Sequence, residues 1–326
     1  MVKISPFVSI KMSSEFGFVL VDNLKKKHYI LDRKLLAVLS DKKKINNLKG
    51  SGLLSTDKDV RKYIEYGKFW FDYDLEDALL YHMFCYRYPF LDYEDGTAFV
   101  TDIERMGEYE KKSKMPSFFK VYDAKQFKLT IPTQFPKIET SHLLETKVAK
   151  SKGNFDKDKL SIFLYSCFGN TTNRNIKNYI TRPVPSGGAK HPTETYIIFP
   201  KGSVFPEGVY HYNVRDHSLE QLYFGDIWDE FLDSTYNIYK GEYMNKFAFV
   251  YTSKVDRAMY RYRDLRSTRA LLIDEGHLVQ NAKLVSRALG LDYISEYKSR
   301  EDKLKSILQL IDDSEPIIST QFFYEK

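Results

Sequence analysis

The chain has 326 residues, of which 43% are hydrophobic and 29% charged, and its formal net charge is +6. This length favours two domains with a large buried core, and the mixture of charges excludes a disordered chain. No run reaches the roughly 18 apolar residues of a membrane span. The start, MVKISPF, lacks the apolar stretch of a secretion signal, so we expect a cytoplasmic protein.

The cysteines and the basic runs exclude further classes of function. Cys85 and Cys167 lie in apolar stretches and match no metal-ligand spacing, which predicts buried reduced thiols and no metal site. The lysine runs Lys25–Lys27 and Lys42–Lys44 are typical of solvated loop tips, although they could meet an acidic peptide leader. Because the sequence has no aromatic-rich basic stripe and no helical reading motif, nucleic acid is not an expected partner.

The first hundred residues alternate short strands with helices. The apolar patterns predict strands over 7–10, 16–21 and 28–31, and helices over 33–39, 56–66 and 74–86. This order fits a winged-helix-like, peptide-binding module, which with a helical extension covers residues 1–130. Periodicity alone leaves open that this region is an extension of a catalytic domain.

A linker is predicted at 131–145, because Pro132 and Pro136 stand there among extended residues and disfavour helix. Beyond the linker, helices are predicted over 157–168 and 268–289, and strands over 194–199, 208–214 and 247–252. One face of the long helix carries apolar residues at helical spacing, namely Leu271, Leu278, Ala282, Val285 and Leu289. Residues 146–326 are therefore predicted to form an α+β domain with a central helix.

The stretch RPVPSGGAKHPTETYIIF, residues 182–199, has the composition of a turn that admits a flat ring. Prolines disfavour helix at its start, and Gly187 and Gly188 allow a planar ligand to approach bare backbone. Ser186 offers a hydroxyl and N–H groups to ring heteroatoms, and Arg182 offers a cation that could stabilise a reduced flavin. An ordinary tight turn between a helix and a strand would explain the same residues.

A second stretch, residues 260–291, places Glu275, Gly276 and His277 in the long helix, where they interrupt the apolar face. A glycine inside a helix costs about 1 kcal/mol relative to alanine, so a close approach at Gly276 should compensate. Packing of a second helix would be such an approach, as would a bound ligand.

The segments PSGGAKHPTE and DEGHLVQNAKLVSRALGL, in this order and spacing, resemble the SagB-type branch of the nitroreductase superfamily. This branch includes flavin dehydrogenases that oxidise azolines to azoles in peptide natural products. The resemblance runs from about residue 146 to the C-terminus and implies a central sheet flanked by helices, an intertwined homodimer and FMN at the dimer interface. Family members often carry a winged-helix-like peptide-binding module as well. The resemblance implies Pro185, Ser186, Gly187 and Gly188 as FMN contacts. Further cofactor-binding candidates are Arg182, Glu275, Gly276 and His277.

The sequence departs from the family pattern in two places. Nitroreductases usually begin with an Arg-Arg-Ser-x-Arg phosphate clamp, whereas this chain has ETKVAKSKGNF. There Lys150 and Lys152 could neutralise a phosphate, but without the bidentate fork of arginine, and a solvated lysine loop is the alternative. Related azoline dehydrogenases carry Lys-Tyr after the glycine turn, and this chain carries Lys190 and His191.

These departures bear on the direction of the redox reaction. Lys190 could take a proton during azoline oxidation if burial and nearby cations lower its pKa. His191 could donate a proton when a dehydroalanine or dehydrobutyrine residue of a lanthipeptide precursor is reduced. The missing tyrosine favours this reduction, with NAD(P)H as electron donor, and azoline dehydrogenation is the alternative. A structural histidine held by a backbone carbonyl is the competing interpretation of His191.

The expected partners are the leader and core of a ribosomal precursor peptide, a second copy of the chain and other peptide-modifying enzymes. A flavin-free peptide-binding scaffold remains open, as does a nitroreductase acting on small quinones. The large N-terminal module argues against the quinone enzyme, because an enzyme that acts on a small molecule has little use for a separate peptide-binding module. The sequence contains no GxGxxG dinucleotide-binding motif, so it does not indicate whether NADH or NADPH supplies the electrons.

Overall fold

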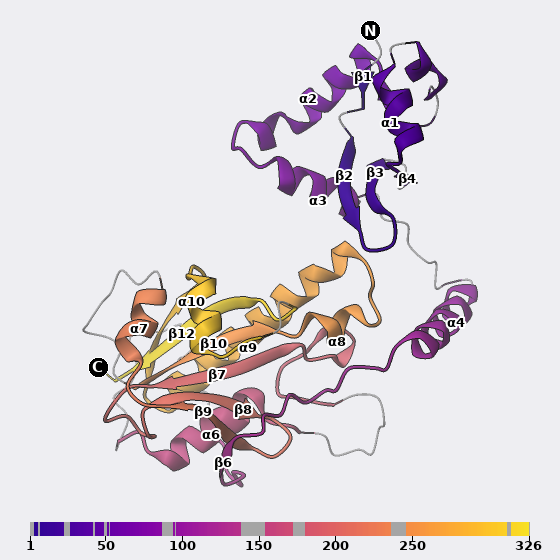
Figure 1. Cartoon of the computed structure of the whole chain (residues 1–326). Helices are drawn as coiled ribbons and strands as arrows, with labels where there is room; N and C mark the ends of the chain where they lie inside the picture. Colours follow the sequence, from indigo (N-terminus) through magenta and orange to yellow (C-terminus); the bar gives the residue numbers. More distant parts are fainter. Residues whose placement is uncertain are drawn as a thin grey trace. The chain divides into compact units, whose positions relative to one another are not determined.

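The computed structural model describes residues 3–5, 7–22, 27–41, 43–48, 51, 53–86, 94, 96–137, 154–171, 180–235, 246–311 and 314–325. The chain forms two compact units, residues 1–100 and 101–326 (Figure 1). Helix α4, Thr97–Lys112, begins in the first unit and continues in the second.

The first unit combines small antiparallel sheets with helices, largely where the sequence predicts them. Its three-stranded sheet has the order β2-β3-β4, and β1 pairs with β5. Helix α1 begins at Asp32, whose carboxylate accepts the N–H of Leu35 at 2.7 Å, as expected of an N-cap. The bounds are β1 Lys3–Ile4, β2 Val8–Ser13, β3 Gly17–Asp22, β4 Lys27–Ile30, α1 Arg33–Ser40, η1 Lys44–Leu48, β5 Leu54–Ser55, α2 Asp57–Phe71 and α3 Glu76–Tyr86.

The tip of the β2–β3 hairpin is apolar and exposed. The side chains of Ile10 and Met12 on β2 and of Phe18 on β3 are 64%, 79% and 56% exposed. Met12 and Phe18 are cross-strand partners, so these side chains share one face of the sheet. Apolar side chains gathered on one exposed face are typical of an interaction surface.

The second unit is built on one seven-stranded antiparallel sheet of order β11-β12-β10-β7-β8-β9-β6. Strands β7, β8 and β10 are buried along their whole length, which indicates that both faces of the sheet are covered. The strand bounds are β6 Lys125–Lys128, β7 Thr193–Phe199, β8 Gly208–Asn213, β9 Ser218–Phe224, β10 Phe247–Ser253, β11 Asp292–Glu296 and β12 Ile317–Tyr324. The helices are α6 Lys157–Phe168, η2 Gly187–Ala189, α7 Trp228–Ser234, α8 Val255–Met259, η3 Leu265–Ser267, α9 Thr268–Ala288 and α10 Glu301–Ile307.

Helices pack against both faces of this sheet, as the predicted α+β class requires. Alternate residues of β7 and β10 point to opposite sides, so each face of the sheet supplies its own core. Helices α6 and α9 pack with one core, which includes Ile197 and Phe249. Helices α7 and α10 pack with the other, which includes Ile198 and Val250. The predicted fold class, a central sheet flanked by helices, is confirmed.

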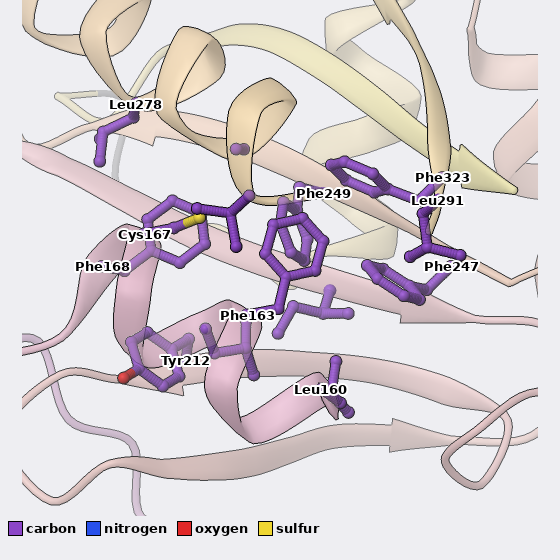
Figure 2. Packing of buried hydrophobic residues seen from close by; sticks show 14 of the residues in the cluster. Leu160, Phe163, Cys167, Phe168, Tyr212, Phe247, Phe249, Leu278, Leu291 and Phe323 are labelled. Atoms are coloured by element: carbon purple, nitrogen blue, oxygen red, sulfur yellow. The ribbon is translucent and has the colours of Figure 1, made fainter. Parts of the chain in front are cut away.

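The core under α6 and α9 is rich in aromatic residues (Figure 2). Phe163 of α6 is fully buried, and its ring lies 5.0–5.9 Å from those of Phe247, Phe249 and Phe323. Cys167, one turn further along α6, and Cys85 in the first unit are both buried and free. Burial raises the pKa of the Cys167 thiol well above its usual range.

Strand β6 differs from its expected environment. The predicted N-terminal module reaches residue 130, but residues 125–128 pair with β9 at the edge of the large sheet, from Lys125 opposite Gln221 to Lys128 opposite Ser218. The boundary between the units therefore lies at Val100, before the predicted linker. None of the helices in the described ranges is long and apolar enough to cross a membrane.

Candidate functional site

The glycine turn that leads into β7 has an unusual backbone. Gly188, Ala189 and His191 have φ of 60°, 53° and 45°, in the left-handed region that residues with a Cβ rarely adopt. Such conformations persist only where the surroundings impose them, and they cluster at functional sites. Lys190 lies between them with φ of −85°.

Asp274 of α9 holds this turn in place. Its carboxylate accepts the Ser186 hydroxyl at 2.5 Å and the N–H of Gly187 at 3.1 Å. The same Ser186 oxygen accepts the N–H of His191 at 2.8 Å, which closes the turn. Burial raises the pKa of Asp274, although the hydrogen bonds from Ser186 and Gly187 act the other way. The hydroxyl proton that the sequence analysis assigned to a flavin ring is therefore used within the protein.

The two glycines differ in what surrounds them. A Cβ at Gly188 would lie 2.4 Å from the hydroxyl oxygen of Tyr262, so this position is restricted by the protein itself. A Cβ at Gly187 would lie 3.3 Å from that of Ala270 on α9, a tight contact. Gly276 has nothing within 4 Å of the equivalent position, so the described part of the chain leaves open space there.

His191 is buried and neutral in this arrangement. Its Nε2 donates to the carbonyl of Ile180 at 3.2 Å, and its side chain is 6% exposed. Burial and the positive charges of Arg182 and Arg257 lower the pKa of His191 to about 3, against the opposing effect of the Ile180 carbonyl. An imidazole with this pKa carries no acidic proton for a substrate near pH 7.

Lys190 has a different environment. It is half-buried, and its ammonium group lies 5.5 Å from the centre of the Phe118 ring, which favours a cation. Burial and the nearby charge of Arg261 lower the pKa of Lys190. Both causes favour the neutral amine, which is the form that accepts a proton.

Arg257 of α8 connects the turn to its surroundings. Its guanidinium donates to the carbonyls of Ser117 at 2.7 Å and His191 at 3.1 Å, and pairs with Glu194 of β7 at 2.5 Å. Residues 113–122, here called the strap, are thereby held beside the turn together with Phe118. Burial would raise the pKa of Glu194, but Arg257, His211 and Arg182 outweigh it and hold that pKa at about 2.

Arg182 has unused hydrogen-bonding capacity. Its Nη1 donates to the carbonyl of Thr193 at 3.3 Å, while Nε and Nη2 have no hydrogen-bond partner among the described residues. Burial lowers the pKa of Arg182 to about 10, so the side chain stays charged at neutral pH. A buried cation with two free donors fits an anionic group of a ligand, since leaving such donors unpaired is costly.

The remaining candidates are not all gathered here. His277 donates from Nδ1 to the carbonyl of Pro185 at 3.3 Å and so belongs to the turn. Glu275 is directed the other way, to a short hydrogen bond with Ser319 of β12, and burial raises its pKa. Lys150 and Lys152 lie outside the described residues.

No pattern in the sequence pointed to Asp274, Arg257 or Tyr262 as residues of the site. Asp274 directly precedes the Glu-Gly-His segment, and its distance of 88 positions from Ser186 gave no local signal. The burial of Glu275 could have been predicted from helical spacing. Glu275 stands four positions after Leu271 and three before Leu278, on the buried face of α9.

Comparison with known proteins gives two peptide-processing relatives. The chain is 28% identical to the trifolitoxin-processing protein TfxB of Rhizobium leguminosarum bv. trifolii over 71% of its own length and 65% of that protein. It is 31% identical to the microcin B17-processing protein McbC of Escherichia coli over 47% of its own length and 58% of that protein. The chain thus spans less than two thirds of either relative. No family model matches the sequence.

The fold has a counterpart among solved structures. A putative nitroreductase from Anabaena variabilis superposes with a TM-score of 0.50 and 20% identity, over 67% of this chain and 45% of the other. This likeness concerns the fold, and the sequence relatives supply the closer relationship. Taken together, the antiparallel core and this structural likeness show that residues 101–326 have a nitroreductase-like fold, and the sequence is similar to those of two peptide-processing proteins.

Proposed function

We propose that the protein is an FMN-dependent oxidoreductase that modifies a residue of a ribosomally made precursor peptide. The observation that carries this proposal is the constrained turn, in which Asp274 fixes the backbone and Lys190 stands beside it with a lowered pKa. A constrained turn that presents an amine with a lowered pKa suits proton transfer to or from a substrate.

The nature of the substrate is inferred from the relatives. TfxB and McbC are described as processing proteins for trifolitoxin and microcin B17. A peptide substrate also gives the first unit a purpose, because the apolar tip formed by Ile10, Met12 and Phe18 offers a surface for a leader segment. Other peptide-modifying enzymes are the further partners that we propose.

The described residues fit an anionic, planar cofactor in two respects. Arg182 keeps two buried donors unpaired, and Gly276 borders open space on α9. In this proposal Arg182 would neutralise negative charge on FMN and the backbone of Pro185 to Gly188 would lie against its ring. A bound flavin would exchange a hydride, and with it two electrons, with the substrate.

The direction of the reaction follows from which side chain handles the proton. The missing tyrosine favoured reduction with His191 as acid, but the pKa of about 3 and the bond to Ile180 make His191 a structural residue in our proposal. Lys190 is suited to act as a base, so we favour dehydrogenation of a thiazoline or oxazoline. Reduction of dehydroalanine or dehydrobutyrine by NAD(P)H is the second candidate, and it would need another acid.

A single preparation tests the main proposal. The full chain is purified, its absorbance is recorded, and any released flavin is identified by chromatography. The protein is then incubated with a synthetic thiazoline peptide and, separately, with a dehydroalanine peptide and NAD(P)H. The masses of the products are measured by mass spectrometry. Loss of two hydrogens from the first supports dehydrogenation, and gain of two by the second supports reduction. A colourless protein that binds peptide without FMN would refute the enzyme and indicate a scaffold.

The leader surface is tested by substitution at the hairpin tip. Phe18→Glu places a charge among exposed apolar side chains and should weaken binding of a fluorescent leader peptide without unfolding the unit. Leu36→Glu is the matched control, because Leu36 is 46% exposed on helix α1 of the same unit. Equal affinity in wild type and Phe18→Glu would contradict this role.

We further propose that the chain functions as a homodimer through α9. Leu272 and Ile273 on this helix are 58% and 57% exposed, and the open space at Gly276 lies on the same helix. Sedimentation of wild type and Ile273→Glu should distinguish a dimer from a monomer. A wild-type monomer at micromolar concentration would contradict the proposal.

A further inference from the structure

The segment between α8 and η3, Tyr260 to Arg263, anchors the start of the second unit. The Tyr260 hydroxyl donates to the carbonyl of Ser113 at 3.1 Å. Arg261 forms a short ion pair with Asp102 on α4, and the Arg263 guanidinium lies 3.8 Å from the centre of the Tyr109 ring. These three side chains are therefore directed toward α4 and the start of the strap.

Tyr262 is directed to the glycine turn instead. Its hydroxyl oxygen lies where a Cβ at Gly188 would approach to 2.4 Å, and the nearest ring carbons would be at 3.1 and 3.2 Å. The Tyr262 backbone is fixed on both sides, since its N–H donates to Ala258 at 3.1 Å and its carbonyl accepts the N–H of Asp264 at 2.7 Å. The hydroxyl itself has no hydrogen-bond partner among the described residues.

This hydroxyl shares the turn with the amine of Lys190. Lys190 follows Gly188 by two positions, and the charge of Arg261, the residue before Tyr262, acts on Lys190. The Arg261 guanidinium also lies 5.5 Å from the centre of the Tyr262 ring. A partly buried phenol with a free donor thus lies against Gly188, two positions before the residue that carries the amine.

We propose that Tyr262 is a catalytic residue that works with Lys190, a role that rests on the proposed function. In the dehydrogenation, Lys190 takes the proton from Cα of the azoline as the Cβ–H bond breaks and a double bond forms between Cα and Cβ. FMN, held by Arg182 and the glycine turn, would supply the acceptor for the hydride and so for the two electrons that the peptide loses. Negative charge grows on the carbonyl oxygen next to Cα, and the Tyr262 hydroxyl donates a hydrogen bond to it.

Removal of the hydroxyl is the direct test. Tyr262→Phe keeps the ring against Gly188 and should lower kcat on the thiazoline peptide by about 10²-fold, the usual effect of losing one donor to a developing oxyanion. FMN content, KM and the calorimetric affinity for the peptide should stay near wild type. Tyr260→Phe is the matched control, because it removes a hydroxyl from the same segment that is bonded to Ser113. Its kcat should remain near that of wild type.

A second measurement does not depend on turnover. Fluorotyrosine is introduced at position 262 or at position 260, and the azole product peptide is added to the flavin-loaded protein. The fluorine resonance at 262 should shift on binding, whereas that at 260 should not.

The outcomes separate this inference from the proposed function. Normal kcat in Tyr262→Phe with an active wild type would overturn the role of Tyr262 and leave the enzyme intact. Loss of FMN together with activity in that variant would also overturn it, because Tyr262 would then only support the turn. A wild type that binds no flavin or converts neither peptide would overturn the proposed function and this role together.

Discussion

Asp274→Asn should loosen the glycine turn. The carboxylate accepts two hydrogen bonds, from Ser186 at 2.5 Å and from Gly187 at 3.1 Å. An amide keeps one acceptor oxygen and points its NH2 group at the second donor, so one bond is lost. A hydrogen bond to a charged group contributes about 1.5–3 kcal/mol. In a domain of this size that loss lowers Tm by about 3–12 °C.

The effect on activity should exceed the effect on stability. With the turn no longer held, the left-handed residues Gly188, Ala189 and His191 can relax, and Lys190 moves with them. A displacement of about 1 Å at a reacting group can lower kcat by about 10²-fold. Calorimetry gives Tm, and peptide turnover gives kcat.

A remote variant separates stability from positioning. Ser161 of α6 donates to the carbonyl of Thr130 at 2.6 Å and lies 2.9 Å from Nε2 of His217, away from the turn. Ser161→Ala leaves these partners unsatisfied and should cost about 1–3 kcal/mol. Ser161→Ala should therefore lower Tm about as much as Asp274→Asn does, while its kcat stays near that of wild type. The reasoning about Asp274 is refuted if Asp274→Asn matches wild type in both measurements, or if Ser161→Ala lowers kcat equally.

Three further predictions concern proton transfer, packing and acid stability. Lys190→Met should lower peptide turnover by about 10²–10⁴-fold, the usual contribution of a general base, whereas His191→Asn, which tolerates the positive φ, should retain most of it; the opposite ranking would restore His191 as the proton carrier. Phe163→Ala should destabilise the second unit by about 3–5 kcal/mol in urea unfolding, because the fully buried ring contacts three others, and a loss below about 1 kcal/mol would contradict the packing described. Glu194 has its pKa lowered from 4.5 to about 2, so the stability it contributes is present above pH 4.5 and is lost as the pH falls toward 2. Stability of Glu194→Gln should fall less over that interval, and equal slopes would exclude this contribution.

The regular elements of the second unit could be predicted where local pattern decides. Helix α6 has the predicted bounds, and all five apolar residues assigned to one face of α9 are buried, because helical spacing alone places them together. The short strand β6 could not be found in this way. Its sequence KQFK has no apolar alternation, and its strand conformation comes from pairing with β9.

For the glycine turn, too, the sequence predicts the position but not the tertiary contacts. Its position follows from the prolines and glycines, since these residues act through their own backbone preferences. The burial of His191 depends on Ile180, Arg182 and Arg257, which the fold brings together. The contact of Tyr262 with Gly188 joins residues 74 positions apart, and no local pattern reports it.

The place of β12 in the sheet bears on how the protein is made. Strand β12 lies between β10 and β11, next to one edge of the large sheet, so β11 cannot join that sheet until the ribosome has added Tyr324. Every strand of the first unit comes from residues 3–55, and this unit ends at residue 100. The first unit can therefore fold on the nascent chain while residues 101–326 are still being translated. During that interval strands β10 and β11 lack β12 as their partner, and their unpaired edges are open to aggregation.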